Sequence, residues 1–403
     1  MNYKFKRVFV IVADSVGIGA DQDAARFGDE GSNTIVHISE KCGGLTIPNM
    51  NALGIGDLAP IVGTSKVSHP KSYSARAREK SNGKDTMTGH WEMMGVLTTQ
   101  PFVTFTDTGF PKELIDELEK RTGHKVIGNV AASGTEIIKE LGEEQMRDNS
   151  LIVYTSADSV LQIAAHEGVT GVEELYRCCD IAREICMKPE WKVGRVIARP
   201  FIGDSKETFK RTPNRHDLAL RPAHTTVMNV LDESGLMVSC IGKIGDIFDG
   251  YGVVKTQKTV SNEDGMDKTI AEVKNPEFIE GFCYVNLVEF DSEYGHRRDP
   301  IGYGRSLEAF DKRVGEMLPF LRKDDLVIIT ADHGNDPTWF GTDHTREKVP
   351  LLMYSPLFKD GRYIDERQSF ADIGITVLKN FNLEKPELLI GEPIDELFLD
   401  EKR

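Results

Sequence analysis

Residues 326–333 read LVIITADH, an apolar, β-branched run that stops at an aspartate and a histidine. Residues 8–14 (VFVIVAD) and 282–291 (FCYVNLVEFD) show the same pattern, each with an aspartate at its end. Such runs are typical of strands that are buried on both faces of a mostly parallel sheet. Ligands bind outside the carboxyl ends of these strands. The strand-end aspartates expected together at one edge of the sheet are Asp14, Asp291 and Asp332.

Helical patterns fill the intervals between these runs, as in residues 111–122 and 306–321. This alternation indicates the α/β class. A chain of 403 residues exceeds the size of one hydrophobic core, so two domains are expected. Residues 102–221 carry short strands among many turns and lack the paired carboxylates and histidines of the flanking segments. We therefore predict a metal-binding catalytic core formed by residues 1–101 and 222–403, with a smaller α+β domain, residues 102–221, inserted into it.

The composition is that of an ordinary globular protein, with 39% hydrophobic residues and a formal net charge of −15. This acidity argues against nucleic-acid binding, which needs a basic surface. An anionic substrate would need metal ions or a few well-placed arginines and lysines. No apolar run approaches the ~18 residues of a membrane span, and the six cysteines form no CxxC pair, which favours reduced thiols. We expect a cytoplasmic protein that binds neither nucleic acid nor a membrane; the sequence does not indicate its oligomeric state.

Three histidines in the last third of the chain, His296, His333 and His344, lie beside carboxylates. One such pair is more often an ordinary surface or core contact. Three pairs, together with Asp14 from the far N-terminus, are better explained by metal binding. Three aspartates and three histidines suit two ions that share one phosphate-sized ligand. Mixed carboxylate and imidazole ligands favour Mn, Zn or Fe over Ca.

Residues 81–95 (SNGKDTMTGHWEMMG) are rich in turn formers and hold two hydroxyls, Thr86 and Thr88. A hydroxyl near two metal ions can attack phosphorus and hold a covalent phosphate. The alternative is an ordinary helix start, in which a threonine caps the helix. We expect Thr88 to be the capping residue and Thr86 to be the freer hydroxyl, although these residues alone leave the choice open.

Further motifs are spread along the chain: DSVGIG (14–19), GKDTMTGHWE (83–92), VYTSADSVLQIAAHE (153–167), VGRVIARPF (193–201), RTPNRHD (211–217), GKIGDIFDG (242–250), YGHRRD (294–299), TADHGNDP (330–337) and GTDHTRE (341–347). Together they resemble the prokaryotic phosphopentomutases of the alkaline phosphatase superfamily. The resemblance covers essentially the whole chain, and its last two segments are highly specific. It implies an alkaline phosphatase-like α/β core with an inserted α+β cap.

The resemblance also implies the chemistry of the core. Thr86 would be the phosphorylated nucleophile, lying between two Mn²⁺ ions or other divalent metals. One ion would be held by Asp14, Asp332 and His333, and the other by Asp291, His296 and His344. A sugar bisphosphate activator such as glucose 1,6-bisphosphate would phosphorylate Thr86 at the outset.

For the substrate, the resemblance implies a pentose phosphate of nucleoside metabolism. The enzyme would interconvert ribose or deoxyribose 1-phosphate and 5-phosphate through a bisphosphate intermediate. Arginine forks suit a phosphate dianion, and a serine–aspartate pair suits ribose hydroxyls. The expected substrate contacts are Ser156, Asp158, Arg195, Arg211 and Lys243, with Arg199, Arg215, Arg297 and Arg298 as further candidates.

Three other functions remain compatible with the same residues. A metal-dependent phosphatase or phosphodiesterase would let water attack the phosphoenzyme. A cofactor-independent phosphoglycerate mutase would be expected to carry serine in place of Thr86. A metal-stabilised binding protein would have no turnover. The inserted domain, not the metal ligands, favours the mutase, because relatives with the same metal ligands differ there.

Overall fold

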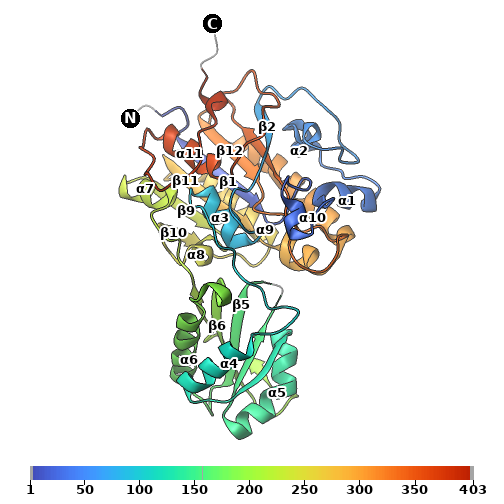
Figure 1. Cartoon of the computed structure of the whole chain (residues 1–403). Helices are drawn as coiled ribbons and strands as arrows, with labels where there is room; N and C mark the ends of the chain where they lie inside the picture. The colour runs from blue at the N-terminus through green and yellow to red at the C-terminus, as the bar shows by residue number, and fades with distance from the viewer. Residues whose placement is uncertain (1–2, 157, 400–403) are drawn as a thin grey trace. The chain divides into compact units, whose positions relative to one another are not determined.

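The computed structural model describes residues 3–156 and 158–399. The chain forms two compact units, one of residues Met1–Thr99 with Arg221–Arg403 and the other of Gln100–Leu220. Figure 1 colours the chain from blue to red, and both the blue and the red segments belong to the first unit. The first unit is therefore built from both ends of the chain. None of the helices in the described residues is long and apolar enough to cross a membrane.

The first unit contains a seven-stranded sheet in the order β10-β9-β11-β1-β12-β13-β2 (Figure 1). The strands β10, β9, β11, β1 and β12 are parallel neighbours, and β13 and β2 extend the sheet in antiparallel pairs. Their bounds are Lys255–Gln257 (β10), Met237–Ile241 (β9), Gly281–Leu287 (β11), Arg7–Ala13 (β1), Asp325–Thr330 (β12), Val349–Tyr354 (β13) and Ser72–Ala77 (β2).

The three strands expected from the sequence are thus the central neighbours β11, β1 and β12. Every residue of these strands is buried, as strands covered on both faces require. Ala13 pairs with Leu287 and Val12 with Thr330, so all three carboxyl ends reach the same edge. This arrangement confirms the predicted α/β class.

Two groups of helices cover this sheet. In the first group α10 contacts α1, α2 and α9, and in the second α11 contacts α3 and α7 while α3 contacts α8. Their bounds are Thr34–Cys42 (α1), Pro48–Ala52 (α2), Thr86–Met93 (α3), Val227–Glu233 (α7), Ile244–Ile247 (α8), Asn262–Lys274 (α9), Pro300–Met317 (α10) and Ala371–Asn380 (α11).

The second unit has a smaller mixed sheet in the order β3-β4-β5-β6-β7, with β8 also paired to β6. Leu161 and Ile163 of β5 belong to a core that packs against α4 and α6, while α5 covers the other face through Ile137 and Ile138. The bounds are Val126–Ala131 (β3), Leu151–Thr155 (β4), Val160–His166 (β5), Arg195–Ile202 (β6), Lys210–Arg211 (β7), His216–Ala219 (β8), Lys112–Thr122 (α4), Gly134–Asp148 (α5) and Val172–Ile185 (α6).

Candidate active site

The carboxyl edge of the central strands brings Asp14, Asp332 and His333 together. Asp14 follows β1 directly, and its amide donates to the carbonyl of Leu287 at the end of β11 (3.2 Å). The Nε2 atom of His333 lies 3.3 Å from Asp14 Oδ1 and 3.5 Å from Asp332 Oδ2. All three side chains are buried. The ligand atoms of this set lie close enough together to hold one metal ion.

A second set forms around a wide helical turn at residues Phe290–Gly295. In this turn the amide of His296 donates to the carbonyl of Asp291, five residues earlier (3.0 Å). Such π-type turns are rare and occur often at functional sites. Here the turn aligns two residues five apart in sequence, so that His296 Nε2 lies 3.1 Å from Asp291 Oδ2. His344 completes the set, with its Nε2 3.0 Å from His296 Nε2 and 3.4 Å from Asp291 Oδ1.

The three histidines share one orientation. In each, Nδ1 lies against a backbone carbonyl: Gly334 for His333 (3.0 Å), Lys84 for His344 (3.0 Å) and Thr342 for His296 (2.7 Å). A carbonyl only accepts hydrogen bonds, so Nδ1 carries a proton, and Nε2 is the ring atom that would bind a metal ion. Metal-bound histidines are commonly held in this way by a second hydrogen bond.

The carboxylates also fit metal binding. Asp14 Oδ1 and Asp332 Oδ2 are buried and accept no hydrogen bond within the described structure, a costly state for a charged oxygen unless a cation satisfies it. Burial and the nearby charge of Asp332 raise the pKa of Asp14. Burial opposes the charged form of His333, but Asp332 and Asp14 outweigh it and raise its pKa well above the usual value. The buried carboxylates therefore favour bound cations, which two divalent ions would supply.

Thr86 is the first residue of α3, and its Oγ1 lies 3.1 Å from Nε2 of His333. The N-terminal end of a helix favours a phosphate group, because its first amides lack partners within the helix. Gly89, one turn further on, allows α3 to approach the centre: a Cβ at this position would overlap the carbonyl of Asp332. The hydroxyl of Thr86 thus faces the cluster of aspartates and histidines.

The expectation that Thr88 caps α3 was wrong. The capping residue is Asp85, whose Oδ1 accepts from the amide of Thr88 (3.0 Å) and whose Oδ2 accepts from its hydroxyl (2.6 Å). A carboxylate three residues earlier therefore performs the role that the sequence-based interpretation gave to the threonine. Thr88 is fully buried and its hydroxyl donates to Asp85, which leaves Thr86 as the more available hydroxyl.

Sequence reasoning missed the side chains that hold these ligands. Asn286 donates to Asp14 Oδ2 (2.9 Å), and Asn335 donates to Asp291 Oδ1 (2.7 Å). Both amides are buried. A signal for Asn286 was present, since it is an amide inside an otherwise apolar strand. Asn335 had no such signal.

Arg346 holds the segment that leads to Thr86 through several hydrogen bonds. Its Nη1 donates to the carbonyls of Ser81 (2.8 Å) and Gly83 (2.5 Å) and to Glu79 Oε2 (2.8 Å). Its Nη2 donates to the carbonyl of Glu79 (2.6 Å), and its Nε donates to Asp23 Oδ1 (3.0 Å). The guanidinium is buried, so these bonds fix the backbone that leads to Thr86.

Glu92 holds the same segment from the other side. Its carboxylate accepts from the amides of Lys80 (2.8 Å) and Ser81 (2.5 Å). It also accepts from the Ser369 hydroxyl (2.8 Å) and the Phe370 amide (3.0 Å). Glu92 is completely buried, so it is a structural anchor between α3 and the C-terminal part of the core.

The expected substrate contacts are divided between the units. Lys243 lies exposed in the core, immediately before α8. In the inserted unit the amide of Asp158 donates to the Ser156 hydroxyl (3.4 Å), and Arg195 lies 3.7 Å from Asp158. These three residues form one group. Arg211, on β7, donates instead to the hydroxyl of Tyr154 (3.3 Å).

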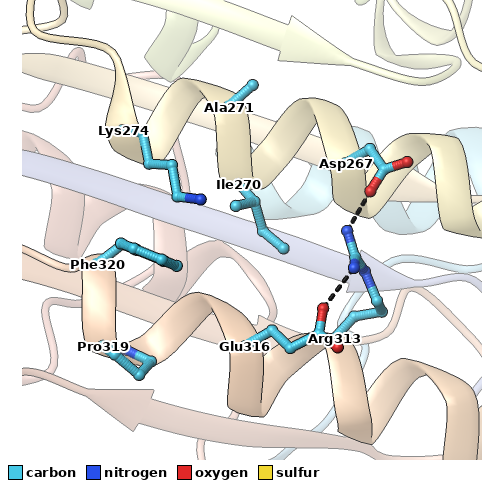
Figure 2. A pocket seen from close by; sticks show the side chains of 8 residues that line it. All are labelled: Asp267, Ile270, Ala271, Lys274, Arg313, Glu316, Pro319 and Phe320. Atoms are coloured by element: carbon cyan, nitrogen blue, oxygen red, sulfur yellow. Dashed lines mark hydrogen bonds and ion pairs between the residues drawn. The ribbon is translucent and has the colours of Figure 1, made fainter.

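A groove of about 620 Å³ lies elsewhere in the core, between α9 and the end of α10. Figure 2 shows Arg313 reaching both Asp267 and Glu316, with Lys274 close to the ring of Phe320. Both carboxylates of the groove are thus paired with Arg313. None of the expected site residues lines this groove, so the metal centre remains the candidate active site.

Comparisons with known proteins identify the family of this chain. Residues 6–385 match the Metalloenzyme superfamily. The chain is 54% identical over 391 residues to a phosphopentomutase of Clostridium beijerinckii, and 55% identical over 391 residues to one of Clostridium perfringens, covering 97% of this chain and 98% of each relative. A phosphoglycerate mutase structure from Leishmania mexicana covers 97% of both chains at 13% identity, with a TM-score of 0.49.

Proposed function

Because this chain belongs to the phosphopentomutase family, it is an isomerase that moves a phosphoryl group on a pentose phosphate, and we propose that Thr86 carries this group between the two positions. The observation that supports this role is the position of the Thr86 hydroxyl, at the start of α3 and 3.1 Å from Nε2 of His333. No other hydroxyl of residues 81–95 is comparably placed, because Thr88 is buried and bonded to Asp85 and Ser81 is buried and accepts from the Thr98 amide.

We assign the metal ligands as two sets. Asp14, Asp332 and His333 would hold one divalent ion, and Asp291, His296 and His344 would hold the other. The ions, which we propose to be Mn²⁺, would neutralise charge on the transferring phosphate and stabilise the threonine oxygen as a leaving group. The protein contributes the orientation of these ligands through the backbone carbonyls at each Nδ1 and through Asn286 and Asn335.

In the proposed cycle the phosphate on Thr86 passes to ribose 5-phosphate or ribose 1-phosphate, which gives a bisphosphate. The bisphosphate turns and returns its other phosphate to Thr86, so that the threonine ester is reformed and the isomer is released. A bisphosphate such as glucose 1,6-bisphosphate would load Thr86 at the outset. The start of α3 would stabilise the phosphothreonine through its free amides.

The test follows the fate of phosphate. The purified protein is incubated with Mn²⁺, glucose 1,6-bisphosphate and ribose 1-phosphate, and ribose 5-phosphate and free phosphate are measured together. We expect isomer without net phosphate release. Mass spectrometry of the peptide containing residues 81–95 should locate phosphate on Thr86. Thr86→Ala should abolish incorporation and Thr88→Ala should retain it; the reverse result, or release of phosphate without isomer, would refute the proposal.

A further inference from the structure

Ser15, the residue after Asp14, has a backbone conformation that residues other than glycine seldom adopt. Its φ angle is +69°, in the left-handed region, where a side chain crowds the backbone. Strained residues of this kind persist only where the surrounding structure holds them, and they are concentrated at functional sites. Ser15 is completely buried, so contacts within the core hold it in this conformation.

The backbone of Ser15 reaches both proposed sets of metal ligands. Its amide donates to Asp332 Oδ1 (3.0 Å). Its carbonyl accepts from the amide of Asn335 (3.2 Å), and the side chain of Asn335 donates to Asp291 Oδ1 (2.7 Å). Asp14 is its direct neighbour in the chain. Ser15 is therefore connected to the aspartates of both sets.

Tyr303 of α10 is the side chain that bonds to Ser15. The two hydroxyls lie 2.9 Å apart, and both residues are fully buried. The ring of Tyr303 also stacks on Phe290, which directly precedes Asp291, with the ring centroids 5.8 Å apart. Tyr303 thus contacts the neighbour of one ligand in each set, through its hydroxyl at Ser15 and through its ring at Phe290. Phenylalanine would supply only the second contact.

We propose that Ser15 and Tyr303 are positioning residues for the ion assigned to Asp14, Asp332 and His333. The inference rests on the metal assignment of the proposed function. The hydrogen bond between the two hydroxyls keeps Ser15 in its left-handed conformation, and this conformation directs the Ser15 amide to Asp332 Oδ1. The other oxygen, Asp332 Oδ2, accepts no hydrogen bond within the described structure and is left for the ion. Substitution of residues that orient metal ligands typically weakens metal binding about ten- to hundredfold.

The first experiment titrates the full-length, metal-free protein with Mn²⁺ and measures binding by isothermal titration calorimetry. Tyr303→Phe removes the hydroxyl and keeps the ring on Phe290. We expect the dissociation constant of one ion to rise about tenfold or more, while the second ion binds as it does in the wild type. Excess Mn²⁺ should restore isomerase activity to Tyr303→Phe, because metal affinity rather than the fold is impaired.

The matched control is Tyr73→Phe on β2. Tyr73 is also buried, and its hydroxyl donates to Asp360 (2.6 Å). Its ring packs on Phe358, which packs on Phe5 just before β1, so Tyr73 lies toward the opposite edge of the sheet. The same chemical change at this position should leave both dissociation constants unchanged.

Two substitutions of Ser15 separate the backbone conformation from general packing. Alanine and glycine both lack the hydroxyl, but only glycine adopts a positive φ without strain. Ser15→Ala should therefore weaken binding of the same ion about tenfold, and Ser15→Gly should bind this ion more tightly than Ser15→Ala. A loss of packing would give the opposite order, since glycine removes more of the side chain.

Unchanged Mn²⁺ binding in Tyr303→Phe would overturn the proposal, as would equal weakening of both ions or Ser15→Gly binding no tighter than Ser15→Ala. If circular dichroism shows that Tyr303→Phe does not fold, the two Ser15 variants decide the question. Asp332→Asn keeps this result separate from the metal assignment. If that assignment is wrong, Asp332→Asn binds both ions like the wild type. If only the positioning role is wrong, Asp332→Asn loses an ion while Tyr303→Phe and the Ser15 variants bind both.

Discussion

The candidate metal centre of the core and the arginines around Arg199 in the inserted unit carry opposite excess charges. In the core, three buried aspartates are crowded at one sheet edge, and two of their oxygens accept no hydrogen bond from the described residues. In the inserted unit, Arg199 and Arg211 are crowded without a carboxylate partner in the part of the chain that the structure describes. Bound cations would relieve the repulsion among the carboxylates, and an anion would relieve the repulsion among the guanidinium groups.

The two regions also differ in rigidity. The core ligands are held by strand ends, by backbone carbonyls at each imidazole and by buried amides. The arginines are long side chains, of which Arg199 is half-buried and Arg211 is exposed. We therefore expect the core to tolerate less change than the inserted unit. The predictions below test this division, beginning with the largest effect.

Asp332→Asn should lower kcat/KM about 10³-fold. The loss of one ligand charge removes metal-derived stabilisation of several kcal/mol. Steady-state isomerisation and metal content, measured on the same preparation, check this. The matched control is Asp116→Asn on α4, an exposed carboxylate paired with Lys112, which should stay within about twofold. Wild-type metal content and activity in Asp332→Asn would contradict the assignment of this ligand.

Glu92→Gln should destabilise the core by about 3 kcal/mol. The four donors around this buried carboxylate leave no acceptor for an amide NH₂ group, which would face backbone amides. Urea unfolding monitored by circular dichroism gives the change in the free energy of unfolding. A value under about 1 kcal/mol would show that this anchor is not needed.

The buried residues that hold the site in place, unlike the strands, could not be predicted from the sequence. The strands β1, β11 and β12 were visible because strands buried on both faces leave uninterrupted apolar runs, and their terminal aspartates followed from parallel topology. Arg346 was not visible, because its partners Glu79 and Asp23 are remote in sequence and meet it only in the folded core.

Competition between neighbouring polar groups explains the one error near the nucleophile. Thr88 and Asp85 both had the chemistry of a helix cap, and only the backbone geometry selects the carboxylate. Arg199 has no carboxylate within ion-pair distance among residues 3–156 and 158–399, and this is likewise a tertiary property, since pairing depends on which carboxylates come near after folding. The roles of the metal ligands and of the substrate contacts stay predictions.

Arg346→Lys should lower kcat about tenfold with little change in KM. Lysine keeps the charge, but it cannot reproduce the fork that holds three carbonyls and the carboxylates of Glu79 and Asp23 at once. A small shift of the segment before Thr86 would misplace the nucleophile. Single-turnover phosphorylation of Thr86 checks this, with Arg313→Lys in the groove of Figure 2 as the control. Equal losses in both variants, or a change in KM alone, would contradict a positioning role.

Glu174→Gln in the inserted unit should have the smallest effect and is the counterpart of Glu92→Gln. Hydrogen bonds from Arg177 and His124 lower the pKa of Glu174 to about 2, so its contribution to stability is present above its unfolded pKa and is lost as pH falls toward 2. The side chain is one-third exposed, and solvent screening limits such a pair to less than about 1 kcal/mol. Unfolding of both glutamine variants at pH 7 gives the comparison directly. A loss from Glu174→Gln as large as that from Glu92→Gln would show that the inserted unit depends on its ion pairs as strictly as the core depends on its buried anchors.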